Sequence, residues 1–406
     1  MCARLPIPCL NHRNIFWHPV ARTGHSRSVR RSHALPCHEQ TDIHHRGDDK
    51  KNSGMRSDAI RFNRPDISES DRKFLADAIA GGHSSGNGVF TQSTETALQQ
   101  LLGTTRALLT TSCTHALEMS ALLCRLQPGD EVIVPSYTFV STASAFAMFG
   151  AKPVFVDSRK DTLNIDAALI ERAVTPRTRA ICIVHYGGVA CEMEAICEIA
   201  NRHNLMLIED NAHGLFAKYK GKSLGAFGAM ATQSFHETKN ITCGEGGALL
   251  INDQSLTERA EILREKGTNR SKFLRGQVDK YTWVDIGSSW VLSDLLAAIL
   301  WGQLQRADLI NTRRVEIWHR YHTELATWSQ RHGVLQPVVP DGCEHVGHVY
   351  HVRFQTGDKR ARFIDHMKQR GISCVFHYQP LHSSPVGQRF GGQAGQCPVA
   401  EHAGEC

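Results

Sequence analysis

Residues 234–240, Ser-Phe-His-Glu-Thr-Lys-Asn, are the stretch from which the fold of this chain can be inferred. They close a short apolar segment typical of a β-strand, and a similar segment, residues 208–210, ends in the acidic pair Glu209-Asp210. The carboxyl ends of parallel strands meet at one edge of a sheet, so Asp210 and Lys239 are expected to face a common ligand. An amine that forms a Schiff base and a carboxylate that keeps a ring nitrogen protonated are what pyridoxal phosphate requires. The pair predicts a pyridoxal phosphate site, whereas Lys239 taken alone would be interpreted as a solvated surface lysine.

A segment suited to the phosphate group lies upstream. Residues 108–118, Leu-Leu-Thr-Thr-Ser-Cys-Thr-His-Ala-Leu-Glu, run from an apolar strand through small hydroxyl residues into a helical pattern. The free N–H groups at a helix start favour a dianionic phosphate, although an ordinary Ser/Thr N-cap is the commoner use of such residues. Neither Gly-x-x-x-x-Gly-Lys nor Gly-x-Gly-x-x-Gly occurs between this strand and helix, so nucleoside triphosphate and dinucleotide sites are poorly supported.

Aromatic residues follow a third strand. A β-branched segment ends at Pro135, and Tyr137 and Phe139 come directly after it. A ring at the end of a strand can stack on a planar cofactor, and core packing is the alternative for either residue.

These motifs together resemble those of the DegT/DnrJ/EryC1/StrS sugar aminotransferases, over roughly residues 60–385. The matching motifs are residues 111–118, 135–142, 209–214, 234–240 and 244–247. The resemblance implies an α/β chain with the PLP-dependent transferase fold (aspartate aminotransferase type I). Such a chain has a large domain with a doubly wound, mostly parallel sheet and a small C-terminal α+β domain.

The resemblance also implies roles for single residues. Lys239 matches the Schiff-base lysine that also shuttles protons, and Asp210 matches the carboxylate that pairs with the pyridine nitrogen. The other positions matching cofactor contacts are Phe139 (stacking on the ring), Cys113, Thr114 and Ser234 (phosphate), His213 (ring hydroxyl) and Ser289 (phosphate of the neighbouring subunit). Most relatives have glutamine at the position of His213 and many have asparagine at that of Ser289; an imidazole can still donate one hydrogen bond.

A narrower likeness concerns the substrate. Four segments are most similar to transaminases that make dTDP-4-amino-4,6-dideoxy-D-galactose: residues 184–193, 264–271, 275–283 and 375–382. They imply transfer of an amino group from L-glutamate to C4 of dTDP-4-keto-6-deoxy-D-glucose, for surface polysaccharides such as lipopolysaccharide or enterobacterial common antigen. The candidate substrate contacts are His185, Tyr186, Lys280, Tyr281, His377 and Tyr378. The alternatives are that the charged residues form a solvated face and that the histidines are hydrogen-bonded polar residues with no role in substrate binding.

The chemistry makes opposite demands on the two central residues. Lys239 must be neutral part of the time to move a proton, and burial beside a cationic cofactor lowers a lysine pKa. Asp210 beside a pyridinium is expected to stay ionised, because the opposite charge favours that form.

Composition excludes several classes of protein. The net charge is +6, but residues 1–54 hold nine Lys and Arg against four Asp and Glu, so the remainder carries only +1. A broad basic face for nucleic acid is therefore not expected. Thirteen cysteines lack the spacing of a zinc site or a disulfide framework, which favours reduced thiols in a cytoplasm and no bound metal. No run approaches the ~18 apolar residues of a membrane span.

The expected organisation has three parts. Residues 1–54 are predicted to be a disordered or non-native extension upstream of Met55, residues 55–310 the large cofactor-binding domain, and residues 311–406 a small domain. The expected helices are residues 68–80, 292–309, 313–328 and 361–370, and the last lies between strands near 349–354 and 372–376. Residues 397–404 resemble the first turns of a helix after which relatives continue, so the small domain is expected to be truncated.

Alternatives remain open at this point. A pyridoxamine-dependent sugar dehydratase has the same fold but carries histidine in place of Lys239. The short C-terminus instead suggests a catalytically impaired nucleotide-sugar binder, and a transaminase acting on another nucleotide keto-sugar fits the same motifs. A dinucleotide-dependent oxidoreductase is the weakest alternative, because its glycine fingerprint is missing. The role implied for Ser289 predicts a homodimer with shared active sites.

Overall fold

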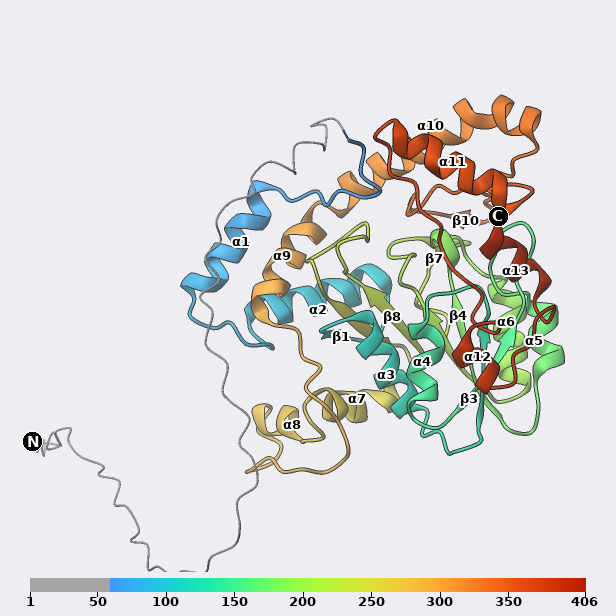
Figure 1. The fold of residues 1–406 in the computed structure, drawn as a ribbon. Helices are drawn as coiled ribbons and strands as arrows, with labels where there is room; N and C mark the ends of the chain where they lie inside the picture. The colour runs from blue at the N-terminus through green and yellow to red at the C-terminus, as the bar shows by residue number, and fades with distance from the viewer. Residues whose placement is uncertain (1–58) are drawn as a thin grey trace, which may run out of the picture. The chain divides into compact units, whose positions relative to one another are not determined.

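A seven-stranded sheet lies at the centre of the computed structural model, which describes residues 59–406 (Figure 1). The predicted extension, residues 1–54, lies outside the described residues. Strand β9 runs antiparallel to both of its neighbours, and the other neighbouring pairs are parallel. In spatial order the strands are β1 (Arg106–Thr110), β9 (Gly247–Ile251), β8 (Met230–Ser234), β5 (Met206–Asp210), β4 (Thr178–Val184), β2 (Glu131–Pro135) and β3 (Lys152–Val156). The predicted mostly parallel α/β sheet is confirmed.

The strand residues alternate between two buried faces. Leu108 and Val132 belong to the core on one face, whereas their neighbours Leu109 and Ile133 belong to cores on the other. This is the period of two that a strand imposes on its side chains. Since both faces are covered, strands such as β2 and β8 are buried along their whole length.

Helices cover both faces of the sheet (Figure 1). One face carries α3 (Cys113–Leu123), α4 (Ser141–Ala147) and α7 (Thr257–Arg264). The opposite face carries α2 (Val89–Leu102) and α9 (Asp294–Gln305) near β1, and α5 (Ala167–Ala173) and α6 (Met193–Arg202) near β4. The elements η1 (Tyr186–Gly188), η2 (Gln254–Leu256) and α8 (Arg270–Leu274) are short connections.

The predicted helix over residues 68–80 is present as α1 (Glu69–Ala80). Ser68 caps it, with the side chains of Ser68 and Asp71 each bonded to the other's backbone N–H. The predicted helix over residues 292–309 is wrong in its extent, because the helical path breaks at Arg306, where φ is −119°. The Arg306 guanidinium bonds to Asp66 and Asp71 at this break. The next helix, α10, then runs from Ala307 to His332 and includes the one predicted over 313–328.

The C-terminal part (residues 307–406) has fewer strands than predicted. The segments 349–354 and 372–376 form only single bridges, Leu335 with Arg353 and Ile60 with Ile372. A strand requires a ladder of successive pairs, and neither segment has a partner long enough to supply one. A small sheet forms instead from β10 (Cys343–Glu344), β6 (Lys218–Tyr219) and β7 (Lys222–Ser223). The helix predicted over 361–370 is confirmed as α11 (Gly357–Gln369).

The last helices lie against the large sheet. After α12 (Pro385–Arg389), α13 (Pro398–Glu405) places Ala400 and Ala403 in the same core as Leu108. The Asp157 carboxylate, just after β3, accepts the backbone N–H groups of Val399 and Ala400 at 3.0 and 2.8 Å. Acceptors at a helix start are stabilising, so this contact fixes the C-terminal end of the chain on the sheet.

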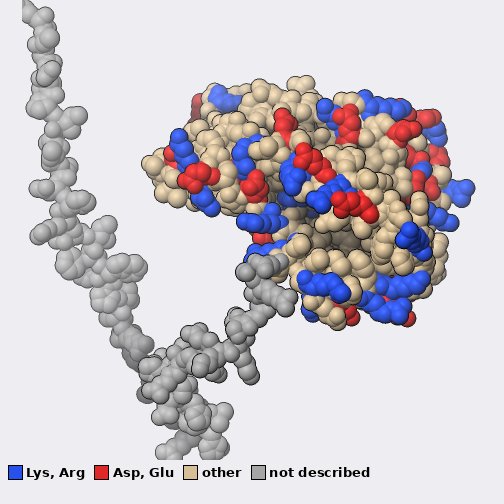
Figure 2. Space-filling view, turned by 90° about the horizontal axis from the view of Figure 1, so that it is seen from above, with Lys and Arg blue, Asp and Glu red and all other residues tan. Residues whose placement is uncertain are grey.

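Positive and negative side chains are interspersed among uncharged ones on the face in Figure 2, as expected for a nearly neutral body. None of the helices within residues 59–406 has the length and apolar character needed to cross a membrane.

Candidate active site

The strand register brings the predicted residues to one edge of the sheet. Asp210, the last residue of β5, is paired with Val184 of β4 on one side and Thr232 of β8 on the other. Ser234 is buried at the end of β8, and the turn after it carries Lys239. The order β4-β5-β8 thus places Asp210 beside the strand that leads to Lys239, and the Asp210 charge acts on the Lys239 amine.

Asp210 is a buried carboxylate with a fixed orientation. It is 5% exposed; Thr142 Oγ1 donates to Oδ2 at 2.8 Å, and the N–H of Ala212 donates to Oδ1 at 3.2 Å. Burial raises the pKa of Asp210, against the opposing effect of these bonds and of the Lys239 charge. A cation placed beside this carboxylate would favour its ionised form, as a pyridinium requires.

Lys239 is partly buried, in an environment of mixed charge. Its backbone N–H donates to the carbonyl of His236 at 2.9 Å, which closes the turn. Burial lowers the pKa of the Lys239 amine, while the neighbouring Cys113 and Asp210 oppose this shift. The amine is consequently neutral more often than a surface lysine, which suits a nucleophile and base.

The start of α3 forms the third side of the site. Ser112 caps this helix by accepting the N–H of His115 at 3.1 Å, and among residues 59–406 no acceptor is found for the N–H groups of Cys113 and Thr114. Gly247 of β9 permits the close approach, because a Cβ there would collide with the backbone of Ser112 and Cys113. Two free N–H groups at a helix start are suited to a phosphate.

The side chains of Cys113 and Thr114 point to different partners. Cys113 Sγ lies 3.5 Å from Thr232 Oγ1 and 4.0 Å from Asp210 Oδ1. Burial raises the pKa of this thiol, so it stays protonated beside the carboxylate. Thr114 Oγ1 lies 2.8 Å from Ser141 Oγ at the start of α4.

His213 lies within the site as a neutral ring. Its Nδ1 accepts the N–H of Gly187 at 3.3 Å, so its proton resides on Nε2, which faces the Tyr378 hydroxyl at 3.2 Å. Burial, followed by the charge of Lys239, holds the pKa of His213 well below its usual value. A neutral ring with one N–H is compatible with the predicted contact to a cofactor hydroxyl.

Of the two aromatic residues after β2, only one is free to stack. Tyr137 is buried, with its ring centroid 5.4 Å from Tyr186 and 5.6 Å from Tyr378, so core packing explains it. Phe139 is 56% exposed and lies at the rim, 6.4 Å from Tyr378. Its predicted stacking on a cofactor remains a prediction.

Three of the predicted substrate contacts come together beside His213. The Tyr186 hydroxyl lies 2.8 Å from His377 Nδ1, and the rings of His377 and Tyr378 stack at 3.9 Å. Burial lowers the pKa of His377 to about 4, so this side chain is neutral at physiological pH. His377 and Tyr378 are partly exposed and can offer hydrogen bonds to an uncharged ligand, whereas Tyr186 is buried behind His377.

The structure corrects the prediction for His185. This residue is 0% exposed; Nε2 lies 2.9 Å from Glu209 Oε2, and Nδ1 accepts the N–H of Cys191 at 3.2 Å. Both ring nitrogens are occupied inside the protein. His185 is therefore a satisfied core histidine and does not contact a substrate.

Lys280, Tyr281 and Ser289 are exposed on the segment that follows α8. Within the described chain, no hydrogen bond or ring contact joins them to Lys239 or Asp210. Their roles remain predictions, and for Ser289 the prediction concerns a neighbouring subunit.

Two further histidines of the site were missed by the sequence analysis. The ring of His348 stacks on His213 at 4.3 Å, and that of His351 lies 5.5 Å from Tyr186. His351 lies in the segment 349–354, and His348 directly precedes it. Because this segment was interpreted as a strand, no role was predicted for either ring. The spacing of His345, His348 and His351 by three residues was the available signal.

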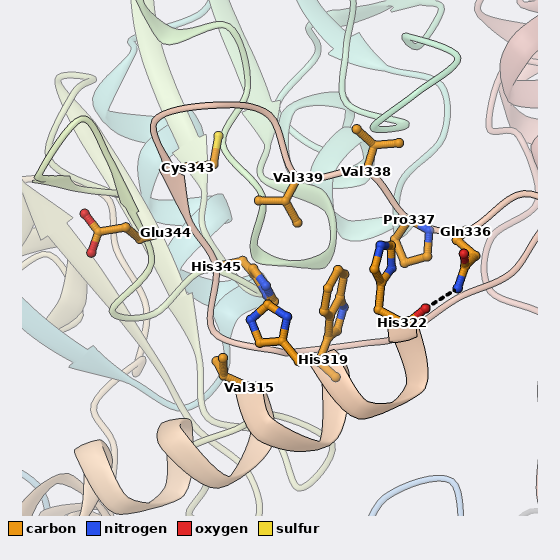
Figure 3. Close-up of a pocket in the computed structure, with 11 residues that line it drawn as sticks. Val315, His319, His322, Gln336, Pro337, Val338, Val339, Cys343, Glu344 and His345 are labelled. Atoms are coloured by element: carbon orange, nitrogen blue, oxygen red, sulfur yellow. Dashed lines mark hydrogen bonds between the residues drawn. The ribbon is translucent and has the colours of Figure 1, made fainter. Parts of the chain in front are cut away.

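A separate hollow of about 640 Å³ lies between α10 and residues 336–345 (Figure 3). Trp318 stacks on His322 at 4.9 Å in its wall, and Gln336 donates to the carbonyl of His322 at 2.9 Å. None of the predicted site residues lines it. Within residues 59–406, no group of three or more His, Cys, Asp or Glu side chains is arranged to hold a metal ion.

Comparison with known proteins gives consistent matches. The model of the DegT/DnrJ/EryC1/StrS aminotransferase family matches residues 65–405. The chain is 36% identical over 314 residues to the uncharacterized protein MJ1066 of Methanocaldococcus jannaschii, covering 76% of this chain and 81% of that protein.

Solved structures extend this likeness to the fold. The aminotransferase TlmJ from Streptoalloteichus hindustanus matches with a TM-score of 0.78 and 31% identity, over 85% of this chain and 91% of that one. Spr1654 from Streptococcus pneumoniae, assigned as a sugar aminotransferase and solved in its PLP form, matches with a TM-score of 0.78 and 26% identity, over 86% and 92%. The same protein has been solved in a PMP form.

Proposed function

Because the chain belongs to the DegT/DnrJ/EryC1/StrS aminotransferase family, whose members depend on pyridoxal 5'-phosphate, we propose that it aminates C4 of dTDP-4-keto-6-deoxy-D-glucose. The amino donor in this proposal is L-glutamate and the product is dTDP-4-amino-4,6-dideoxy-D-galactose, the reaction of EC 2.6.1.59. The fold is that of PLP-dependent transferases and the chain is a sugar aminotransferase by family. The observation that carries the proposal is that Lys239 and Asp210 lie near enough for their charges to interact, beside the free start of α3.

The residues fit the three parts of the cofactor. Lys239 would hold its aldehyde carbon, Asp210 its ring nitrogen, and the N–H groups of Cys113 and Thr114 its phosphate. When bound, the cofactor supplies an electron sink that accepts the electrons of a broken C–H bond. The lowered pKa of Lys239 supports its use as the base that would carry a proton between the cofactor carbon and sugar C4.

The substrate side supports a sugar ligand. His377, which is bonded to the buried Tyr186, and Tyr378 offer neutral imidazole and hydroxyl groups, which bind sugar hydroxyls without requiring a charge. A nucleotide diphosphate needs cations in addition, and we assign these to the exposed segment around Lys280. The identity of the sugar in this proposal rests on the likeness of residues 184–193 and 375–382 to the narrower group.

The proposed active enzyme is a homodimer that shares its active sites. Trp283 is 76% exposed, and Tyr281, Val284 and Ile286 beside it are also exposed. A contiguous exposed apolar segment of this kind marks an interface. We place the neighbour's cofactor phosphate near Ser289, which follows this segment.

The division into domains at residue 310 remains part of the proposal, since that position falls within α10.

The test begins with absorbance. The purified chain with pyridoxal phosphate is expected to show a band between 300 and 500 nm that shifts on addition of L-glutamate and is absent from Lys239→Ala. Mass spectrometry of the products from a panel of dTDP- and UDP-linked keto-sugars then identifies the acceptor. A folded protein without the band contradicts the proposal, and a band with no amino transfer to any sugar leaves a nucleotide-sugar binder.

A further inference from the structure

We propose that Asn240, together with His348, is a positioning residue that holds the lysine loop (residues 236–240) on the C-terminal part and limits the access of water to the Lys239 amine. This inference rests on the proposed function, because it concerns the same lysine. It adds a residue to which neither the sequence analysis nor the comparisons give a role.

The Asn240 side chain uses all of its hydrogen-bonding groups. Asn240 is 8% exposed; its Nδ2 donates to the carbonyl of Val346 at 2.8 Å and to Asn311 Oδ1 at 3.2 Å. Its Oδ1 lies 3.1 Å from His348 Nδ1. One amide next to the lysine thus binds both the start of α10 and the segment 346–348.

His348 is in the protonation state that this contact requires. Burial, followed by the charges of Lys239 and Arg314, holds the pKa of His348 well below its usual value. The neutral ring carries one proton, and donation to Asn240 Oδ1 places that proton on Nδ1. The same ring stacks on His213 at 4.3 Å, which fixes its plane.

The segment that holds Asn240 is closely packed on α10. Gly347 has φ +58°, and a Cβ there would lie 2.7 Å from the Arg314 carbonyl of α10. The segment therefore packs directly on the helix backbone. The other end of the lysine loop is also tied to α10, since Asn63 Nδ2 donates to the Glu237 carbonyl at 2.7 Å and Arg314 donates to Asn63 Oδ1 at 2.9 Å.

These ties explain how a loop lysine can remain partly buried. Burial is the main cause of the lowered Lys239 pKa, so opening the loop to water should return that pKa toward the value of an ordinary lysine. The titratable groups that face the amine are Asp210 of β5, Cys113 of α3, and His213, His348 and His377. The three histidines are neutral, and Asn240 bears no charge, so the expected effect comes from water access.

The experiment measures the pKa of Lys239 in the full-length protein without cofactor. Competitive acetylation by acetic anhydride at a series of pH values, followed by mass spectrometry of the Lys239 peptide, gives the midpoint at which the amine becomes reactive. Lys368, exposed on α11, is the internal reference. The midpoint is compared between wild type, Asn240→Ala and Asn252→Ala.

Asn252 is a matched control. Its Nδ2 also donates to two backbone carbonyls, Gly225 at 3.0 Å and Gly228 at 2.8 Å, but it follows β9 at the edge opposite to the site. We expect Asn240→Ala to raise the midpoint by about one pH unit, which is a roughly tenfold smaller neutral fraction at pH 7. Asn252→Ala should leave the midpoint at the wild-type value.

His348 supplies a second test that does not depend on the folding of the Asn240 variant. His348→Ala removes the donor to Asn240 and should raise the midpoint, whereas His348→Asn keeps an N–H near the position of Nδ1 and should restore it. The inference is overturned if Asn240→Ala titrates like Asn252→Ala, or if both His348 variants titrate like wild type. Since acetylation needs no cofactor, a failure of the proposed function is detected separately, by the missing absorbance band.

Discussion

At the scale of single residues, Asp210 is expected to matter for turnover more than for cofactor retention. Asp210→Asn keeps the shape of the side chain but cannot hold a proton on the cofactor nitrogen by its charge. We expect kcat to fall by at least about a hundredfold, since electrostatic stabilisation by one group is commonly worth this much. The absorbance band due to Lys239 should persist. Thr142→Ala, which removes only one bond to the carboxylate, is the control, and an equal loss in both variants would contradict the charge role.

Glu209, the neighbour of Asp210, is expected to matter for stability alone. Its carboxylate accepts the backbone N–H groups of Gly225, Phe227 and Gly228 besides the His185 ring. Glu209→Gln turns an N–H toward these donors, so the free energy of unfolding in urea should fall by about 3 kcal/mol.

The stability that the Glu209 carboxylate contributes depends on pH in a definite direction. Burial alone would raise the pKa of Glu209, but the His185 and backbone bonds hold it below its usual value. A lowered pKa stabilises the fold above the unfolded-state pKa, and this contribution is lost as the pH falls through the folded-state value. Below about pH 5 the wild type should therefore lose stability more steeply than Glu209→Gln. Parallel acid titrations would refute the assignment.

At the scale of elements, the contact between β9 and α3 governs phosphate binding. Gly247→Ala forces the start of α3 away from the sheet, so the free N–H groups of Cys113 and Thr114 move from their positions. We expect the Kd for pyridoxal phosphate to rise at least about tenfold, with about 1–3 kcal/mol lost in stability from overpacking. Gly81→Ala, where φ is −68° and the nearest atom would lie at 3.3 Å, should change neither quantity. Unchanged binding by Gly247→Ala would show that α3 does not hold the phosphate.

Local signals explain which elements could be predicted. The strand ends that carry Asp210 and Lys239 follow from apolar segments and their order, which are properties of short stretches of sequence. The segment 349–354 is apolar and aromatic in the manner of a strand, yet whether it pairs depends on a distant partner. His348 and Asn240 gain their positions from the same long-range packing, so their contact could not be read from either segment alone.

For the whole molecule, some of the predicted site residues lie together in a single chain, whereas others would belong to a site shared by two chains. The charges of Lys239 and Asp210 interact within one chain, whereas Ser289 and Tyr281 are exposed. His185 and Tyr186 are both buried, but the His185 ring is bonded to Glu209 and Cys191 in the core, whereas the Tyr186 hydroxyl lies 2.8 Å from His377. The hydrogen-bond partners, which depend on the complete fold, distinguish such neighbours.

Shared active sites give a prediction for mixed dimers. Lys239→Ala removes the lysine, and Ser289→Asp places a negative charge where the neighbour's phosphate is proposed to lie, so each variant should be inactive alone. When the two are unfolded and refolded together, a mixed dimer contains one doubly altered site and one site with both wild-type residues. Since half of the dimers are mixed, the mixture should regain about a quarter of the wild-type activity. If each site were built from one chain, no mixture could exceed its two components, and the Ser289 assignment would be wrong.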